Sequence, residues 1–453
     1  MKRKITQKLV DWKNTPGHKP LLLQGARQVG KTYILEEFGR EYYENYIKVS
    51  LDLVPDVGDF LKKNINPLEI IAFLESLYNV RILPHKTLVI LDEIQDCKRA
   101  LLALKYFQED YPQYDIVAAG SLLGVAVNQG KKPGEEDETR EDEFSYPVGK
   151  VDELHLFPMD FEEFLWATGN DILADDIRSH YLSDEPMPAS VHSMALDMYQ
   201  KYLVVGGMPE SVQTWVDTHS YLECRTVQQS ILVGYNADMA KYAKPATTVK
   251  IRACFDSIPS QLAKENRKFQ YKLAMKGGTA KIFGEAIEWL ILAGIVNKCK
   301  LISHGFIPVS AQEDDSDFKI YMSDVGLLNT KARMPVQLLQ NSVDADNTFL
   351  GSVAENYVGQ ALAANGIALH YWKNDNTQEI EYVLQDGMNV IPVEVKKGRK
   401  VDAISMNNFK KTYSCPFAYR ISGKNFGFAN EIKSVPLYAV FCIETTDSSL
   451  RSE

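Results

Sequence analysis

One string of eight residues, at positions 25–32, constrains the fold of this chain more than any other feature. It reads Gly25, Ala26, Arg27, Gln28, Val29, Gly30, Lys31 and Thr32. An apolar run at 21–23 precedes it and a helical pattern follows it from Tyr33, so the G-x-x-x-x-G-K-[ST] pattern stands between a predicted strand and a predicted helix. In that context the backbone N–H groups of the loop converge on phosphates, helped by the positive end of the helix.

The loop predicts a bound nucleoside triphosphate, and we expect ATP with Mg²⁺. The eight loop residues would cradle the phosphates. Lys31 would reach the β and γ phosphates, and the hydroxyl of Thr32 would ligate Mg²⁺.

Short apolar runs alternate with helical patterns through the first 125 residues. The runs lie at 21–23, 46–51, 87–91 and 114–119. Because continuous β-branched runs separated by helices are typical of parallel strands, we predict an α/β fold whose parallel sheet is covered on both faces.

Polar residues follow two of these predicted strands. Asp92 and Glu93 come directly after the run at 88–91, where an aspartate can hold the water shell of a metal and a glutamate can polarise the attacking water. We predict Asp92 as the metal-side acid and Glu93 as the catalytic base. Ser121 follows the run at 114–119, and it either contacts the γ-phosphate and orients the water or caps the next helix.

An arginine supplied across a subunit interface would complete such a site in a homo-oligomer. The sequence does not select one arginine for this role. The candidates are Arg99, Arg140 and Arg225.

Several motifs together resemble one family. They read LLLQGARQVGKT, TLVILDEIQ, AAGSLLG, LFPMDFEEFL, YLVVGGMPESV, GSVAENYV and PVEVK. They are similar to bacterial and archaeal AAA-type P-loop ATPases with a C-terminal domain of unknown function, over nearly the whole chain. The resemblance implies an ATPase domain, a winged-helix segment and a restriction-endonuclease-like domain. Where that family often has Gly-Arg, this chain has Gly149 and Lys150, so the resemblance brings no cis-acting arginine to this position.

Changes in the helical, strand and charge patterns divide the rest of the chain into further segments. Residues 250–328 read as three helices and a hairpin, the order of a winged helix, with strands at 295–299 and 319–322 and a polar turn at 313–317. A carboxylate-rich stretch at 128–143 predicts a mobile loop. The predicted segments are an ATPase domain at 1–160, a helical region at 161–245, a winged-helix domain at 246–335, a restriction-endonuclease-like α/β domain at 345–445 and a disordered tail at 446–453.

Four residues of the last domain form a candidate nuclease site. Glu355 lies on a predicted helix, Glu381 on a strand, and Glu394 and Lys396 on the next strand, where alternation places both side chains on the face towards Glu381. Such carboxylates can bind Mg²⁺, and the lysine can orient water for attack on a phosphodiester. The set resembles the PD-(D/E)xK nuclease core, with Glu381 in place of the usual aspartate. The alternative is an ion pair in a site without activity.

Basic residues with interleaved aromatics in the winged-helix segment predict a contact with the DNA backbone, and the alternative is a solvated helix face. They are Lys264, Arg267, Lys268, Phe269, Tyr271, Lys272, Lys276 and Lys281. A second basic cluster comprises Lys396, Lys397, Arg399 and Lys400. The net charge of −10 excludes a protein that coats nucleic acid over its whole surface.

Cysteines and apolar runs bear on the compartment. The six cysteines are scattered singly, which indicates a reducing environment, and no apolar run is long enough to span a bilayer. We therefore expect a cytoplasmic protein without a membrane partner.

Its predicted function is Mg²⁺-dependent ATP hydrolysis that controls a winged-helix and nuclease-like module acting on DNA. The rival is a slow nucleotide switch that binds a protein or DNA partner and whose nuclease fold does not cleave.

Overall fold

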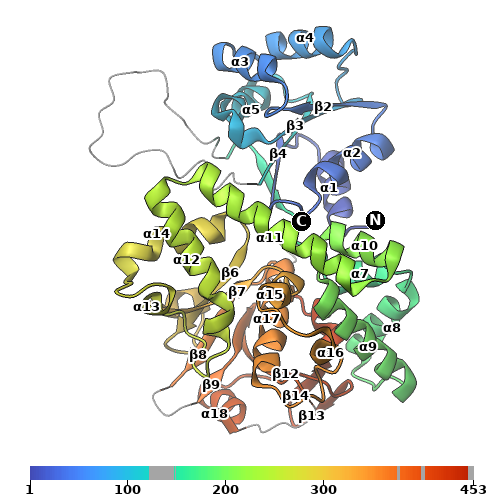
Figure 1. Ribbon diagram of the computed structural model, residues 1–453. Coiled ribbons are helices and arrows are strands. Elements are labelled where there is room, and N and C mark those ends of the chain that lie inside the picture. The colour runs from blue at the N-terminus through green and yellow to red at the C-terminus, as the bar shows by residue number, and fades with distance from the viewer. Residues whose placement is uncertain (122–146, 148, 375–377, 399–403, 447–453) are drawn as a thin grey trace. The chain divides into compact units, whose positions relative to one another are not determined.

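The computed structural model describes residues 1–121, 147, 149–374, 378–398 and 404–446 (Figure 1). The chain divides into two compact units. The first, here called the N-terminal unit, comprises Arg3–Phe157 and Leu292–Gly294, and the second, the larger unit, contains the rest. The stretch predicted as a mobile loop, 128–143, and nearly all of the predicted tail lie outside the described residues. Within the part that is described, no helix combines the length and apolarity that a membrane span needs.

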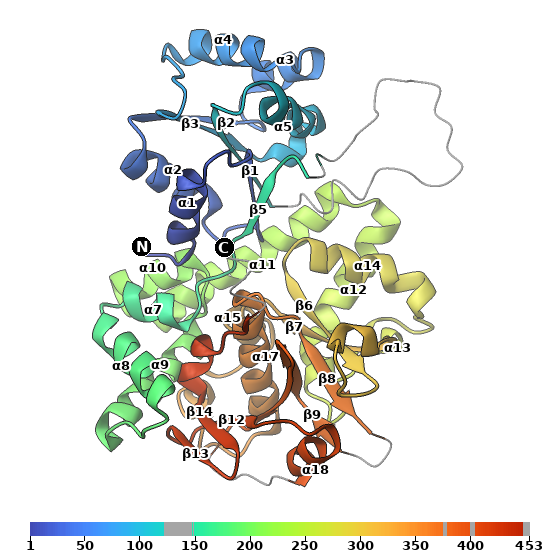
Figure 2. The same cartoon turned by 180° about the vertical axis from the view of Figure 1, so that it is seen from behind.

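The N-terminal unit contains the predicted parallel sheet, which is confirmed. Its strands run in the order β2-β3-β4-β1-β5, and every neighbouring pair is parallel (Figures 1 and 2). The strands are β1 (Leu21–Gln24), β2 (Asn45–Ser50), β3 (Thr87–Asp92), β4 (Asp115–Gly120) and β5 (Asp152–His155). The helices are α1 (Ile5–Asn14), α2 (Lys31–Tyr42), α3 (Pro55–Lys63), α4 (Pro67–Tyr78) and α5 (Lys98–Asp110), with a 3-10 turn, η1 (Ile94–Asp96).

The core of this unit explains why its central strands are mostly apolar. Every residue of β3 and β4 is buried, as expected for central parallel strands covered on both faces. One core cluster joins side chains of the sheet, such as Val89 and Ile116, to apolar side chains of α3, α4 and α5. Helix α2 packs against β2 and β3 through its own apolar stripe, which includes Ile34, Leu35 and Phe38.

The first half of the larger unit is helical, as the periodicity predicts. Its helices are α7 (Phe161–Ala167), α8 (Asp171–Ser183), α9 (Ala189–Val205), α10 (Pro209–Thr218), α11 (Tyr221–Tyr242), α12 (Pro245–Leu262), α13 (Tyr271–Ala274) and α14 (Ala280–Leu292). The chain changes direction between α9 and α10. There Gly206 has a φ of 70°, and Gly207 passes so close to Met159 that their backbones exchange a 2.7 Å hydrogen bond from Met159 N–H to Gly207 O.

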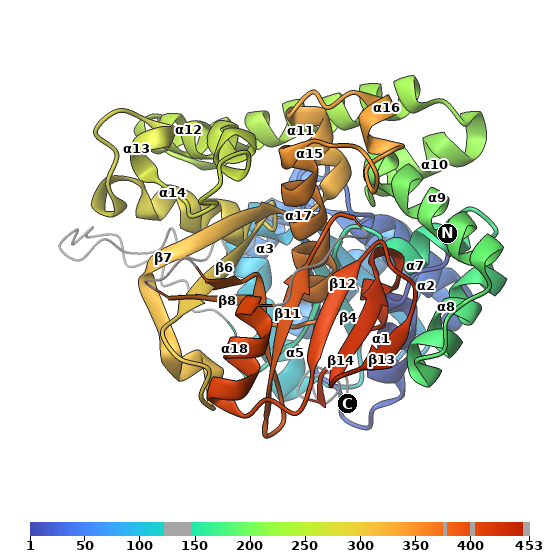
Figure 3. The same ribbon diagram turned by 90° about the horizontal axis from the view of Figure 1, so that it is seen from below.

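Two sheets occupy the rest of the larger unit (Figure 3). The first, in the order β7-β6-β8-β9, contains β6 (Val296–Ile302), β7 (Glu313–Met322), β8 (His370–Lys373) and β9 (Glu379–Ile380). The second, in the order β10-β11-β12-β14-β13, contains β10 (Tyr382–Asp386), β11 (Asn389–Val395), β12 (Ala418–Ser422), β13 (Gly427–Ala429) and β14 (Ile432–Pro436). The helices are α15 (Val325–Lys331), α16 (Val336–Leu339), α17 (Thr348–Ala364) and α18 (Ile404–Tyr413), with 3-10 turns η2 (Val309–Gln312) and η3 (Leu437–Cys442).

The predicted polar turn at 313–317 was wrong. These residues belong to β7, and the connection from β6 occupies 303–312 instead. The register between β6 and β7 shifts at Lys300 and Leu301, so that β7 bulges at 315–317. The carboxylates tolerate this place because side chains on β6 and β8 pair with them: Lys300 and His370 contact Glu313, and Lys373 donates to Asp317 at 2.6 Å.

The strands β6 and β8 connect two segments that the sequence suggested as separate domains. Strand β6, from the predicted winged-helix segment, pairs in parallel with β8 of the predicted restriction-endonuclease-like segment. The two segments therefore share one sheet. Their division at 335 and 345 stays a prediction.

The close approach at Gly207 gives a test of this packing. A Cβ at Gly207 would lie 1.9 Å from the backbone oxygen of Met159, whereas a Cβ at Gly234, inside α11, would meet nothing within 4 Å. We expect Gly207→Ala to lower the free energy of unfolding by about 3 kcal/mol. Gly234→Ala should be neutral or stabilise the protein by up to ~1 kcal/mol, since alanine favours the helix. Urea unfolding followed by circular dichroism measures both, and equal midpoints would contradict the prediction.

Candidate functional site

The phosphate loop joins β1 to α2 with a backbone that only certain residues can adopt. Gly25, Gln28 and Gly30 have φ values of 151°, 67° and 93°. A Cβ at Gly25 would stand 2.2 Å from the carbonyl oxygen of Leu156, so this position requires glycine. Successive turns of this kind direct backbone N–H groups towards one point, which is how a loop binds an anion.

The ammonium group of Lys31 lies over the loop. Its Nζ donates hydrogen bonds to the carbonyl oxygens of Gly25 at 2.9 Å and Ala26 at 2.8 Å, and the residue is buried. The lysine at the first position of α2 thus adds a positive charge to the positive end of the helix. This arrangement can hold a polyphosphate.

Thr32 and Asp92 connect the loop to β3. The hydroxyl of Thr32 donates to Oδ2 of Asp92 at 2.8 Å, and Asp92 is buried at the carboxyl end of its strand. Because β1 and β3 both lie beside β4 and run parallel to it, their carboxyl ends emerge at the same edge of the sheet. The two oxygen-bearing side chains are the kind of ligand that Mg²⁺ prefers.

Glu93 follows Asp92 in a left-handed conformation with a φ of 52°. Its backbone N–H donates to Oδ1 of Asp92 at 3.1 Å, and its carboxylate accepts from Nε2 of Gln95 and from the hydroxyl of Ser121, the latter at 3.5 Å. The structure therefore places Ser121 beside Glu93. The alternative of a helix cap concerns residues after Ser121, which lie outside the described part of the chain.

Two residues at this site escaped the sequence analysis. Arg3 is buried and donates from Nη1 to the carbonyl oxygen of Val29 at 3.0 Å and from Nη2 to that of Phe157 at 2.7 Å. No motif marks this arginine. Gln95 belongs to the string TLVILDEIQ, where its position two residues after Glu93 could have indicated the contact.

The three arginine candidates differ in their surroundings. Arg99 lies on α5, and Arg140 is outside the described residues. Arg225 donates from Nη2 to the carbonyl oxygen of Met334 in its own unit, and burial lowers its pKa. Lys150, at the position of the family's arginine, pairs with Glu109 at 2.9 Å. An arginine acting across an interface stays a prediction.

Three of the four candidate nuclease residues lie together. Glu381 stands between β9 and β10, and its carboxylate accepts from the N–H of Val395 at 3.3 Å. Nζ of Lys396 is 3.5 Å from an oxygen of Glu381 and 3.5 Å from an oxygen of Glu394. Burial raises the pKa of Glu394 although Lys396 opposes this shift. Burial works against the charge on Lys396, but both carboxylates outweigh it and raise its pKa.

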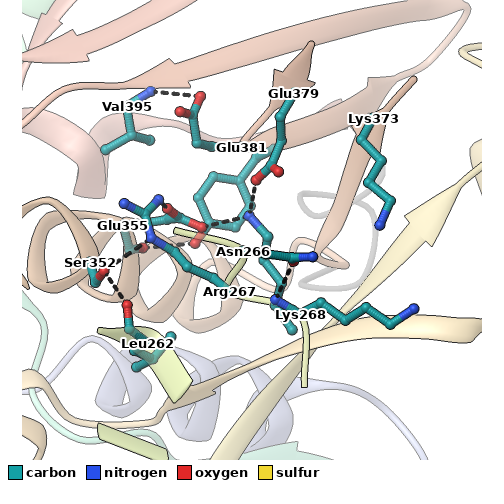
Figure 4. Close-up of polar contacts among 12 residues, drawn as sticks. Leu262, Asn266, Arg267, Lys268, Ser352, Glu355, Lys373, Glu379, Glu381 and Val395 are labelled. Atoms are coloured by element: carbon teal, nitrogen blue, oxygen red, sulfur yellow. Dashed lines mark hydrogen bonds and ion pairs between the residues drawn. The ribbon is translucent and has the colours of Figure 1, made fainter. Parts of the chain in front are cut away.

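The fourth residue, Glu355, belongs to a different set of contacts (Figure 4). It lies on α17, is 1% exposed, and accepts from Nζ of Lys319 at 2.8 Å and from Tyr321 and Arg267. Lys319 also pairs with Glu379, so two cations and two carboxylates form this cluster. Among the residues that the structure describes, the nuclease carboxylates do not form a group of three with oxygens within 4.8 Å of one another.

Several of the predicted DNA-contacting residues have partners inside the protein. Arg267 pairs with Glu355, Lys268 pairs with Asp317 at 2.7 Å, and Phe269 is buried. Lys264, Lys272, Lys276 and Lys281 are exposed, and Tyr271 is half-buried. In the second basic cluster, Lys396 pairs with carboxylates, Lys397 donates to the carbonyl oxygen of Asn347 at 3.1 Å, and Arg399 and Lys400 fall outside the described ranges.

The ion pair of Lys319 with Glu355 gives a test. Both side chains are 1% exposed, so Lys319→Met would leave part of a buried negative charge uncompensated. We expect the free energy of unfolding to fall by about 3 kcal/mol, because breaking a buried pair costs its full desolvation. Lys281→Met, at an exposed position, is the control and should change little. Equal urea midpoints for the two variants would contradict the role given to Lys319.

Comparison with known families identifies the first domain. Residues 17–165 match the AAA domain family, and residues 196–337 and 350–440 match two domains of unknown function (DUF8612 and DUF4143). The N-terminal part of the chain is thus a P-loop ATPase domain of the AAA type. No curated protein is significantly similar to the chain in sequence.

Two solved structures are similar over much of the chain. A Walker-type ATPase of Pyrococcus abyssi has 14% identity and a TM-score of 0.42, covering 73% of this chain and 95% of that one. The ORC1 protein of Aeropyrum pernix, solved in complex with DNA, has 13% identity and a TM-score of 0.28, covering 74% of this chain and 94% of that one. At TM-scores below 0.5 neither similarity bears on function.

Proposed function

We propose that this chain hydrolyses ATP with Mg²⁺ at the edge of the parallel sheet, and that its nucleotide state controls the larger unit. The observation that carries the first part is the hydrogen bond from Thr32 to Asp92, with Glu93 directly after it. It supports the proposal because it brings the loop at 25–32, two oxygen-bearing side chains and a further carboxylate to one edge of the sheet.

Each residue has a distinct part in the proposed reaction. The backbone N–H groups of 25–32 and the ammonium group of Lys31 bind the β and γ phosphates. The hydroxyl of Thr32 and the carboxylate of Asp92 would hold Mg²⁺, since their oxygen atoms suit this ion. When bound, Mg²⁺ offsets the negative charge of the phosphate oxygens. Glu93 accepts a proton from the attacking water, while Gln95 and Ser121 orient its carboxylate.

The proposed base can be tested apart from nucleotide binding. We expect Glu93→Gln to retain ATP and to lower kcat for hydrolysis by about 10²- to 10⁴-fold, because the amide cannot take a proton. Lys31→Ala should lose ATP binding itself. Glu41→Gln, an exposed carboxylate on α2, is the control and should behave as the parent protein. Phosphate release and binding of a labelled nucleotide measure the two effects, and unchanged turnover in Glu93→Gln would remove this residue from its role.

The second part of the proposal concerns the larger unit. The order α12, α13, α14 and then the β6–β7 hairpin supports a winged-helix interpretation, and α17 followed by β10, β11, α18 and β12 supports a restriction-endonuclease-like one. In this view ATP orders the loops around Lys31 and Glu93, and hydrolysis releases them. A contact of the exposed lysines with DNA remains part of the proposal.

One observation favours the alternative in which the nuclease-like fold does not cleave. The carboxylate of Glu355, which would serve a metal ion, is paired with Arg267 and with Lys319, and Lys319 also contacts Glu379. A metal would have to displace two cations, one of them fully buried, and this costs more than binding at an open carboxylate. The larger unit would then act as a binding module that responds to nucleotide.

Plasmid nicking distinguishes the two versions. We expect the purified full-length protein, with Mg²⁺ or Mn²⁺ and with or without ATP, to nick supercoiled DNA no faster than Lys396→Ala does. The control is Lys411→Ala, which changes an exposed lysine on α18. Nicking that disappears in Lys396→Ala and persists in Lys411→Ala would establish an active nuclease site and overturn the non-cleaving version.

A further inference from the structure

Two histidines and an aspartate from three distant segments meet in the N-terminal unit. His18 precedes β1, His85 precedes β3, and Asp115 is the first residue of β4. Asp115 begins the strand that ends at Gly120, so the group lies at the opposite edge of the sheet from the phosphate loop. The proposed ATPase reaction uses none of the three side chains.

The distances within the group fit a metal site. Nε2 of His18 is 3.4 Å from Oδ1 of Asp115, and Nδ1 of His85 is 3.2 Å from the same oxygen. All three potential ligand atoms lie within 4.8 Å of one another. In a tetrahedral zinc site the bonds to nitrogen and oxygen are about 2.0–2.2 Å, which separates the ligand atoms by roughly 3.3–3.5 Å. Small movements of the side chains would therefore admit the ion.

The surroundings of His18 hold its ring in the orientation that a ligand needs. Its Nδ1 faces the carbonyl oxygen of Lys19 at 3.5 Å, and its ring packs against Trp12 with centroids 4.3 Å apart. The indole N–H of Trp12 donates to the same carbonyl at 2.8 Å. A histidine that gives one ring N–H to a backbone carbonyl presents its other nitrogen to a metal, and this is the usual outer contact of metal-binding histidines.

The group opens onto a cavity. His18 and His85 line a space of about 490 Å³ together with residues that include Lys13, Asn14 and Gln113. The side chain of His85 is 65% exposed, whereas that of Asp115 is 1% exposed. An ion held by the three protein ligands would thus keep at least one position open towards the cavity, as in zinc sites that bind water or a small ligand.

We propose that His18, His85 and Asp115 form a binding site for Zn²⁺. Two imidazoles and a carboxylate suit zinc among the divalent metals, whereas Mg²⁺ and Ca²⁺ prefer a shell of oxygens. Bound zinc would join the segment before β1, the turn before β3 and the start of β4, and it would therefore stabilise the N-terminal unit.

Zinc binding to the full-length protein tests the site. Metal-free and nucleotide-free protein is dialysed against Zn²⁺ at pH 7.5, and bound metal is measured together with the change in melting temperature. We expect one tightly held zinc ion per chain and a rise in melting temperature. His85→Ala should weaken binding by more than about 10-fold, since the loss of an outer contact alone already costs that much. Because His85 is exposed, the variant should fold, which circular dichroism checks.

The matched control is His219→Ala, which removes another exposed histidine. It should bind zinc as the parent protein does. Equal zinc affinity in the parent and in His85→Ala, or no zinc retained by the parent, overturns the proposal. Neither result affects the proposed ATPase, because Glu93 and Lys31 belong to the other edge of the sheet.

Cobalt supplies a second readout. Co²⁺ in a tetrahedral site of two imidazoles and a carboxylate absorbs in the visible range without a thiolate charge-transfer band. We expect this spectrum in the parent protein and its loss in His85→Ala. A thiolate band would assign the metal to cysteine and contradict the site.

Discussion

The hydrogen bond between Thr32 and Asp92 fixes the geometry on which the nucleotide site depends. It joins the first turn of α2, the helix that follows β1, to the end of β3, and β4 lies between β1 and β3 in the sheet. The parallel order makes this possible, since all three strands deliver their carboxyl ends to one edge. Glu93 and Ser121 lie at the same edge, because each is the residue that directly follows its strand. Arg3 also supports the loop, because it donates a hydrogen bond to the carbonyl oxygen of Val29.

The residues of the nucleotide site were predictable because their signals are local. A loop with fixed glycine spacing and a carboxylate at a strand end are visible in short strings, and the rules for parallel sheets bring them together. Arg3 had no such signal, since its partners are backbone oxygens of residues far along the chain. The residues at 313–317 were taken for a turn because carboxylates usually seek water. Their lysine partners lie on other strands, and the composition of a segment does not tell which strands will lie beside it.

Glu355 and Asp115 illustrate two ways to bury a carboxylate, and they lead to different chemistry. A charge withdrawn from water needs a partner. Glu355 is paired with a lysine and an arginine, which a metal ion would have to displace. Asp115 is paired with two histidines, whose imidazole nitrogens are themselves of the kind that binds zinc. The alternation of the sequence correctly grouped Glu381 with Glu394 and Lys396, but it could not reveal that Lys319 of β7 reaches Glu355 of α17.

The pairing of β6 with β8 affects how the chain can be synthesised. On a ribosome, the β6–β7 hairpin emerges well before β8, its parallel neighbour. Until then one edge of β6 carries unpaired backbone N–H and C=O groups, and such edges readily add strands from other molecules. The N-terminal unit contains only Leu292–Gly294 from the later chain. The nascent protein therefore passes through a stage in which nearly all of the N-terminal unit has been synthesised while β6 still has an unpaired edge.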